Sequence, residues 1–124
     1  MLNKKSKKIK SVKIISSGRI AIPAMGKTLD AFVSDSLGRA PFIIIYDVET
    51  QKFESCENPG FTLKDGSGLK VSEIILENKA TILLTREIGT KAYSVLMKEH
   101  IDIHLLNSGG TVNSAIKKFL TDQQ

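Results

Sequence analysis

The sequence of 124 residues contains no tryptophan and a single cysteine, Cys56. One cysteine cannot form a disulfide bond within the chain, and it excludes a zinc site closed by several cysteines. The longest apolar runs, at residues 42–46 and 81–85, are far shorter than the roughly 20 residues that cross a bilayer. No apolar segment follows the N-terminal lysines, as a secretory signal would require, so we expect a cytoplasmic protein without a membrane span.

Acidic residues are absent from positions 1–13, which contain six of the 18 lysines and arginines. The remaining 111 residues hold 12 basic and 13 acidic side chains, so the net charge of +5 comes from this N-terminal segment. The aromatic residues lie in apolar patterns and not among lysines, as they would in a nucleic-acid-binding surface. We expect residues 1–18 to be a basic, flexible extension without a specific nucleic-acid partner. The alternative is weak, salt-sensitive binding to nucleic acid or anionic surfaces.

Strand patterns dominate the first half of the remaining chain. Residues 19–23 form a short strand that ends at a proline, and segment 12–15 can extend it. Residues 42–46 are a continuous apolar run, as in a strand covered on both faces. Residues 53–57 can return antiparallel to that run, which predicts a hairpin.

Two stretches lack a regular apolar pattern. Residues 24–40 are rich in turn-forming residues, and residues 60–68 contain three glycines. Loops longer than about 12 residues are uncommon in compact domains and often carry function. These two loops are therefore the first places to look for a site.

The apolar period changes near residue 68. Helical spacing is found at 68–79, at 90–99 and most clearly at 112–120, while 81–85 and 101–105 have strand patterns. Strands that alternate with helices pair in parallel through right-handed crossovers. We therefore expect 81–85 and 101–105 to be parallel, interior strands.

These segments together predict one α/β domain over residues 19–121. The expected order is β-ββ-α-β-α-β-α, with a mixed sheet of five strands and helices packed on its faces.

Two patterns that suggest enzymes have simpler explanations. Residues 21–28 match a relaxed phosphate-binding loop, but Pro23 removes a backbone N–H donor and no clear helical pattern follows. Four acids suggest a two-metal nuclease, yet such a site needs carboxylates on the first strand, which has none. We interpret these acids as solvated turn residues: Asp30, Asp35, Asp47 and Glu49. We expect no enzyme.

Three residues can serve as soft metal ligands. Cys56 is the one thiol, while His100 follows a predicted helix and His104 lies in a predicted strand. We expect structural roles for both histidines, so Cys56 is the candidate metal ligand.

Other residues fit an anionic ligand. Arg39 stands between Gly38 and Ala40 just before a buried strand, and Arg86 with Glu87 follows the carboxyl end of another. Residues 108–111 precede the last helix and include Gly109 and Gly110. They fit either an anion site at the helix N-terminus or a tight turn capped by Thr111.

Short motifs across residues 19–120 resemble the dinitrogenase iron–molybdenum cofactor biosynthesis family, the nitrogenase accessory factors and their relatives. The motifs in the first half are Ile20–Pro23, Leu29–Ala31, Val33–Ser34, Gly38–Phe42, Asp47–Glu49 and Glu57–Pro59. Those in the second half are Gly66–Gly68, Thr85–Gly89, Lys91–Ala92 and Gly109–Val112.

The resemblance implies a ribonuclease H-like α/β fold and a non-enzymatic role. Members of the family bind or carry an iron–molybdenum or related metal–sulfur cluster during cofactor assembly. The expected partners are such an anionic cluster or another small anion, and a cofactor-assembly protein, with the chain a monomer or weak homodimer. The alternative is a regulatory or interaction module of the same fold that has lost cluster binding.

The resemblance also implies the ligand site. The family has a histidine and an aromatic residue before its Gly-Arg motif, where Ser36 and Leu37 stand here, and a second histidine where Asp65 stands. We expect one cleft formed by both loops, residues 86–87 and residues 108–111. The cofactor-binding residues predicted for it are Ser36, Arg39, Asp65, Arg86, Glu87, Gly109, Gly110 and Thr111, with Cys56 as the candidate metal ligand.

Overall fold

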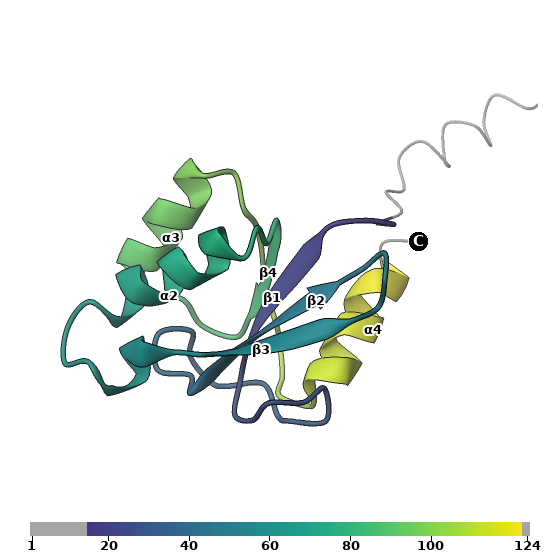
Figure 1. Ribbon diagram of the computed structural model, residues 1–124, viewed down its shortest axis with the longest axis horizontal. Coiled ribbons are helices and arrows are strands. Elements are labelled where there is room, and N and C mark those ends of the chain that lie inside the picture. Colours follow the sequence, from purple (N-terminus) through teal and green to yellow (C-terminus); the bar gives the residue numbers. More distant parts are fainter. Residues whose placement is uncertain (1–14, 123–124) are drawn as a thin grey trace, which may run out of the picture.

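Helices lie on both faces of one five-stranded sheet in the computed structural model, which describes residues 15–122 (Figure 1). The arrangement confirms the predicted α/β class and the predicted order of elements. In chain order these are β1 (Arg19–Ala24), β2 (Phe42–Asp47), β3 (Phe53–Glu57), the 3-10 helix η1 (Pro59–Thr62), α2 (Ser67–Glu77), β4 (Ile82–Thr85), α3 (Thr90–Lys98), β5 (Asp102–Leu105) and α4 (Val112–Asp122).

The strands lie in the order β3-β2-β1-β4-β5, and β2 runs opposite to the other four strands. The predicted hairpin of β2 and β3 is present and is closed by a turn. In this turn the Asp47 N–H donates to the Lys52 carbonyl at 2.8 Å, and the Thr50 N–H donates to the Asp47 carboxylate at 3.0 Å. The predicted parallel pairing of β4 and β5 is also confirmed.

The prediction that both parallel strands are interior was wrong for one of them. Strand β4 is interior, but β5 lies at the edge of the sheet. The chain continues into α4 after β5, and among residues 15–122 no further strand pairs with the outer side of β5. Ile101, just before β5, is buried, whereas Leu105 at its end is 63% exposed. All four residues of β5 are exposed or only partly buried, as expected of a strand that has one neighbouring strand.

The core has two layers, one on each face of the sheet. Successive side chains of β1 point to opposite faces, so Ala21 packs toward α2 and α3 while Ile20 and Ile22 pack toward α4. Both layers are buried, which explains why the β1 and β2 patterns read as continuous apolar runs. Figure 1 shows α2 and α3 on one side of the sheet and α4 on the other.

The predicted flexible loop at 60–68 is shorter than expected. Helix η1 occupies its start, and α2 begins at Ser67, so only residues 63–66 connect the two. Asn58 caps the start of η1, because its side-chain oxygen accepts a hydrogen bond from the Gly60 N–H at 3.0 Å. Pro59 fits the first position of a helix because that position needs no N–H donor.

The long stretch after β1 remains without a helix, as predicted. Isolated bridges join Ala24 to Val33 and Phe32 to Thr111, which fixes this stretch against the start of α4. Because no helix follows Lys27 in this fully described stretch, residues 21–28 do not form a phosphate-binding loop.

The N-terminal predictions fall mostly outside the described residues. This applies to positions 1–14 of the basic extension and to residues 12–14 of the possible strand extension, while Ile15 is not in a strand. Among residues 15–122, no helix combines the length and the apolar character needed to cross a membrane.

Leucine-to-alanine substitutions in β4 and β5 provide a test of the strand order. Leu83→Ala, at a fully buried position of interior β4, should lower the free energy of unfolding by about 2–5 kcal/mol. Leu105→Ala, at the edge, should change it by less than about 1 kcal/mol. Urea denaturation followed by circular dichroism measures both values. Equal losses would contradict an edge position for β5.

Candidate functional site

A cavity of about 500 Å³ opens beside the carboxyl ends of β1 and β4. Three segments line it: residues 36–39 after β1, residues 64–68 at the start of α2, and residues 87–92 at the start of α3. We call this cavity the α2–α3 pocket. Open α/β sheets commonly bind ligands at the carboxyl ends of their strands, and ligand pockets are commonly of this volume.

Small residues allow the three segments to approach each other. A Cβ atom at Gly38 would lie 2.8 Å from the Ser67 Oγ, so the loop after β1 rests directly on the start of α2. A Cβ atom at Gly68 would lie 3.4 Å from the Cβ of Ala92, which places the starts of α2 and α3 side by side. The close contacts therefore position all three walls of the pocket.

Two helices begin at the pocket, and both have glycine as the residue before the first turn. Gly66 precedes α2 and Gly89 precedes α3, and neither helix start has a side-chain capping hydrogen bond. The first N–H groups of a helix have no partner within the helix, and the helix dipole gives this end partial positive charge. Both helix starts thus offer unused donors to an anion.

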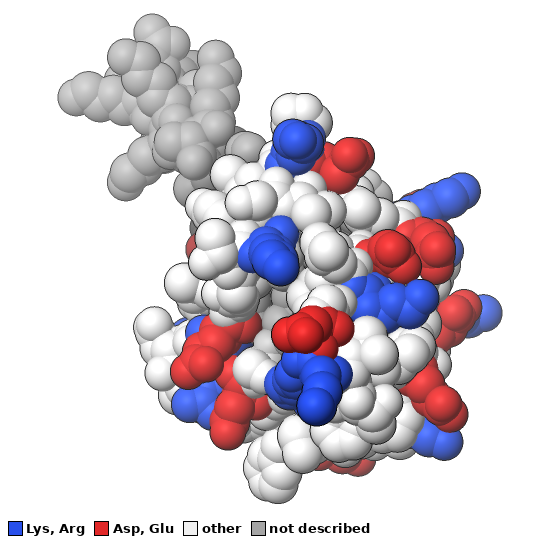
Figure 2. Space-filling view, turned by 90° about the vertical axis from the view of Figure 1, so that its left-hand side faces the viewer, with Lys and Arg blue, Asp and Glu red and all other residues white. Residues whose placement is uncertain are grey.

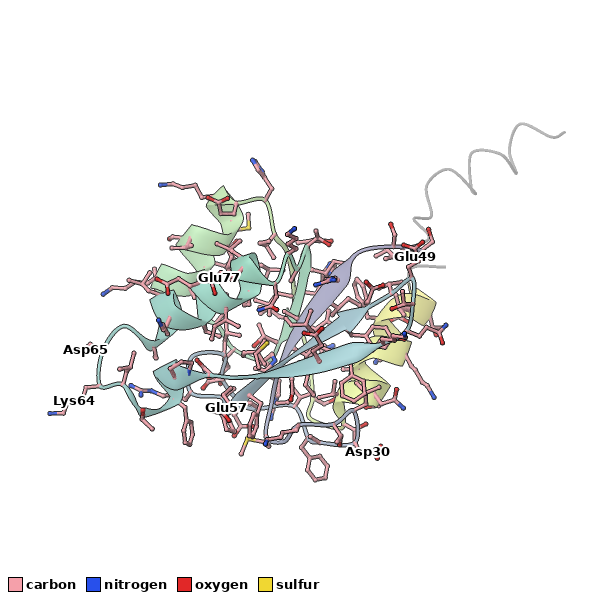
Figure 3. All side chains as sticks on the ribbon, viewed as in Figure 1. Asp30, Glu49, Glu57, Lys64, Asp65 and Glu77 are labelled. Atoms are coloured by element: carbon pink, nitrogen blue, oxygen red, sulfur yellow. The ribbon has the colours of Figure 1, made fainter. Side chains whose placement is uncertain are left out.

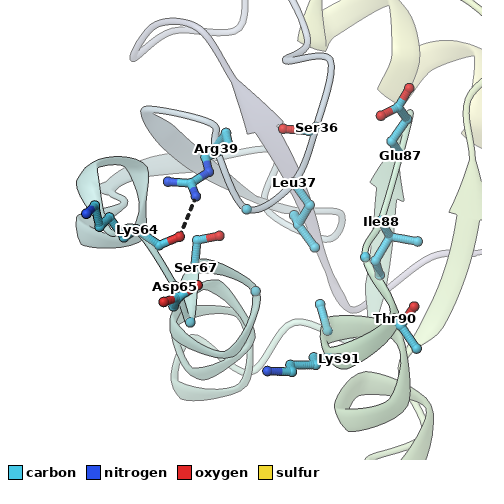
Figure 4. Close-up of a pocket in the computed structure, with 15 residues that line it drawn as sticks. Ser36, Leu37, Arg39, Lys64, Asp65, Ser67, Glu87, Ile88, Thr90 and Lys91 are labelled. Carbon is cyan, nitrogen blue, oxygen red and sulfur yellow. Dashed lines mark hydrogen bonds between the residues drawn. The ribbon is translucent and has the colours of Figure 1, made fainter.

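Arg39 lies at the pocket but has protein partners. Its guanidinium donates to the carbonyl of Leu63 and, at 3.0 Å, to that of Lys64 (Figure 4). The side chain therefore holds the connection between η1 and α2. This gives Arg39 a second role beside the predicted one of holding an anionic ligand.

Asn58 was not predicted as a site residue, yet it supports the same wall. It is buried, and its amide donates to the carbonyls of Ala40 at 2.8 Å and Gly38 at 3.3 Å. It joins the loop after β1 to η1, so it fixes the backbone on both sides of Arg39. The signal was present in the Asn58–Gly60 sequence, because asparagine before proline and glycine favours such a turn.

The charged side chains at the pocket are mixed in sign. Arg39, Lys64 and Lys91 are the cations, and Asp65 and Glu87 are the acids. Figure 4 shows that the Lys91 side chain extends toward α2. The Glu87 carboxylate points away from α2. Figure 3 places Lys64 and Asp65 together at the outer tip of the connection before α2. Figure 2 likewise shows both signs dispersed over the visible face.

The single cleft predicted from the sequence is divided in the structure. Ser36, Arg39, Asp65 and Glu87 line the α2–α3 pocket, whereas Gly109 lines a second cavity of about 500 Å³ between β5 and α4. The sheet separates the two, because α4 packs on the opposite face from α2 and α3.

The remaining predicted residues line neither cavity. Arg86 forms an ion pair with Asp35 at 2.6 Å. Thr111 accepts a hydrogen bond from the Ser114 N–H at 3.1 Å, which is the capping role left open by the sequence. Gly110 has a φ of +124°, a conformation that favours glycine, and its carbonyl accepts from the Val33 N–H at 2.9 Å.

Comparison with known proteins gives a family match over almost all described residues. The model of the family described as dinitrogenase iron-molybdenum cofactor matches residues 18–122. The chain belongs to this family. No curated protein matched the chain.

Two solved structures are similar to this member of the dinitrogenase iron-molybdenum cofactor family. The apo form of the orange protein from Desulfovibrio gigas is 33% identical, with a TM-score of 0.81, and the match covers 86% of this chain and 89% of that one. A NifB-like protein from Thermotoga is also 33% identical, with a TM-score of 0.76 and coverage of 86% and 90%. Family and fold both point to a cofactor-related role.

The pocket does not offer the soft ligands that a metal–sulfur cluster of this family would need for direct bonding. Ser36 and Asp65, the two positions at which the family resemblance implied cluster ligands, come from different loops but line the same pocket. No cysteine or histidine is among the residues that line it. Hydroxyl and carboxylate oxygens are hard ligands and suit iron or molybdenum sulfide poorly. Residues 15–122 also contain no group of three potential ligands able to hold a metal ion.

Cys56 lies away from both cavities, on edge strand β3. Partial burial of the thiol raises its pKa, and the nearby charge of Glu54 raises it further. Because the thiolate is the form that binds metals, a raised pKa weakens Cys56 as a ligand. The case for it as a metal ligand is therefore poor.

The two histidines lie in different surroundings. His100 is exposed, has a φ of 63° and lies two residues after the end of α3. The His104 Nε2 lies 3.0 Å from the Asp102 carboxylate, without the angle of a hydrogen bond, and its ring packs edge-on against Phe119.

Alanine substitutions at two glycines test the walls of the pocket. Gly38→Ala brings a methyl group within 2.8 Å of the Ser67 Oγ, so the hydroxyl must rotate, at a cost of about 1 kcal/mol or more. Gly68→Ala meets only an ordinary contact with Ala92. It should leave stability unchanged or raise it by up to about 1 kcal/mol, because alanine favours helix. Thermal and urea denaturation compare the two, and the reverse ranking would contradict these contacts.

The reactivity of Cys56 tests its surroundings. Its raised pKa predicts that the rate of alkylation by iodoacetamide reaches its midpoint above the pH usual for a thiol. Glu54→Gln removes a negative charge that disfavours the thiolate, so the midpoint of the alkylation rate should shift to lower pH. Rates measured between pH 7 and 10.5 would show this, and a midpoint at or below the usual value would refute the assigned burial.

Proposed function

We propose that this chain is a non-enzymatic carrier domain that holds an anionic metal–sulfur cluster of cofactor assembly in the α2–α3 pocket. One observation carries the proposal: two helix starts without side-chain caps and Lys91 meet in one cavity at the carboxyl ends of parallel strands. Such an arrangement attracts negative charge.

Charge and hydrogen bonds, and not direct metal–protein bonds, would hold the cluster. Metal–sulfur clusters of this kind are anionic, and the pocket supplies helix N–H groups, ammonium groups and hydroxyls instead of thiolates. Interactions of exposed charges are screened at high salt. Binding of this kind is therefore weak and reversible, which suits a carrier.

The similar structures support the proposal in a general way. The family name refers to a molybdenum-containing cofactor, and the structure of the orange protein is described as an apo form. An apo form is a protein without its bound group. This chain covers 89% of the orange protein and shares its fold, so a comparable binding role is supported.

The positions of the predicted site residues refine the proposal. Ser36 and Glu87 contribute to the walls of the pocket, while Arg39 keeps the start of α2 in place. Arg86, directly after β4, forms an ion pair with Asp35 of the loop that precedes the pocket residues 36–39. The transfer partner we propose is a cofactor-assembly protein, with this chain acting as a monomer or weak homodimer.

Lysine substitutions at the two ends of α3 test the carrier function. Isolated iron–molybdenum cofactor, added anaerobically and followed by its visible absorption, should bind the native chain. Lys91→Ala removes a charge at the pocket and should weaken binding about tenfold, as expected for the loss of a charge-assisted hydrogen bond. Lys98→Ala removes the same charge at the far end of α3 and should leave affinity within about twofold.

The salt dependence and the control variant make the test decisive. Binding should weaken as ionic strength rises. Equal loss in both lysine variants would indicate attraction to the overall charge and not to the pocket. No binding by the native chain would contradict the carrier function and favour the regulatory or interaction module.

A further inference from the structure

One wall of the α2–α3 pocket is tied to the rest of the protein by a single side chain. Residues 61–66 run from η1 to the start of α2, all six are exposed, and residues 64–66 line the pocket. We propose that residues 61–66 are a movable strap, that the Arg39 guanidinium latches it, and that its opening widens the access to the pocket. The role in access rests on the proposed function, because it assumes that the cargo occupies this pocket.

The strap has few other contacts that hold it. Arg39 donates to the carbonyls of Leu63 and Lys64, which lie 24 and 25 residues away along the sequence. Within the described part of the chain, every other hydrogen bond of the strap stays within residues 58–70, and no ion pair involves it. Its large apolar side chains, Phe61 and Leu63, are exposed and belong to neither core layer. Segments with so few buried apolar contacts open at a low free-energy cost.

The two ends of the strap differ in their freedom to move. Gly60, just before the strap, is buried, and a Cβ atom there would lie 3.0 Å from the Asn58 Oδ1, so this end is fixed. Gly66, at the other end, has a φ of +81°, and a Cβ atom there would meet no atom within 4 Å. Glycine accepts large changes of its backbone angles, and hinges are commonly a few such loop residues. Gly66 is therefore the hinge of the strap.

The backbone of Arg39 is fixed, in contrast to the strap. The carbonyls on either side of it, those of Gly38 and Ala40, accept hydrogen bonds from the buried Asn58 amide at 3.3 and 2.8 Å. The guanidinium is a planar fork, which bonds two carbonyl groups at once, as its contact with Lys64 illustrates (Figure 4). A lysine at this position keeps the charge but lacks the fork. Arg39 is thus a positioning residue for the wall of the pocket.

Limited digestion of the ligand-free chain with trypsin tests the latch, and mass spectrometry measures the cut after Lys64. Arg39→Lys should speed this cut about tenfold, because it loses charge-assisted hydrogen bonds and proteolysis follows the population of the open form. Arg86→Lys is the matched control. It makes the same change in a residue that pairs with Asp35, outside the strap, and should leave the rate within about twofold. Circular dichroism confirms that both variants are folded.

The kinetics of cargo binding test the role in access. Isolated iron–molybdenum cofactor is mixed anaerobically with each variant and followed by stopped-flow absorption. Wider access speeds association and dissociation by the same factor, so Arg39→Lys should raise both rate constants about threefold or more and leave Kd within about twofold. A raised Kd with an unchanged association rate would identify Arg39 as a direct contact and overturn the role in access.

The outcomes separate this inference from the proposed function. A cut after Lys64 that is no faster in Arg39→Lys than in Arg86→Lys would overturn the latch, whether or not the cofactor binds. No binding of the cofactor by the native chain would overturn both the proposed function and the role of the strap in access, while the trypsin result would still decide the latch. A faster cut together with a matched rise of both rate constants would support the whole inference.

Discussion

The parallel pairing of β1 with β4 is the constraint on which the rest of the structure depends. Ile20 and Ala21 of β1 pair with Ile82 and Leu83 of β4, so both strands end at the same edge of the sheet. The segments that follow them, residues 36–39 and 87–92, consequently meet at one pocket. Strand β1 is buried on both faces, which requires a helical layer on each side. The position of the pocket is therefore set by strand direction before any side chain contributes.

Most of the fold could be predicted because apolar spacing reports how each segment is buried. Short apolar runs and one alternating segment gave the strands, helical spacing gave three helices, and the change of period near residue 68 separated the hairpin from the parallel part. Lateral order is different, because the pattern of a strand shows which face is buried and not which neighbours it has. The edge position of β5 was missed for this reason, although the exposed Leu105 is consistent with it.

The site was harder to predict than the fold. Residues 86 and 87 are adjacent in sequence, yet Glu87 lines the α2–α3 pocket whereas Arg86 turns to Asp35. Sequence alone also could not show that the Arg39 guanidinium donates to backbone carbonyls. Nor could it show that the buried Asn58 amide bonds to the carbonyls of the residues on either side of Arg39. These features depend on contacts between segments about 20 residues apart or more. Sequence patterns also could not show that the pocket residues 36–39 and residues 108–111 belong to opposite faces of the sheet.

The start of α3 shows how easily such a site can change during evolution. Gly89 has an ordinary φ of −78°, and a Cβ atom there would meet no atom within 4 Å, so the position accepts a residue with a Cβ atom. Serine or aspartate at this position would cap the helix from within the chain and use the donors now open to a ligand. Gly66, with a φ of +81°, lacks this freedom. A single substitution at residue 89 would thus close one set of helix donors to the pocket without disturbing the fold.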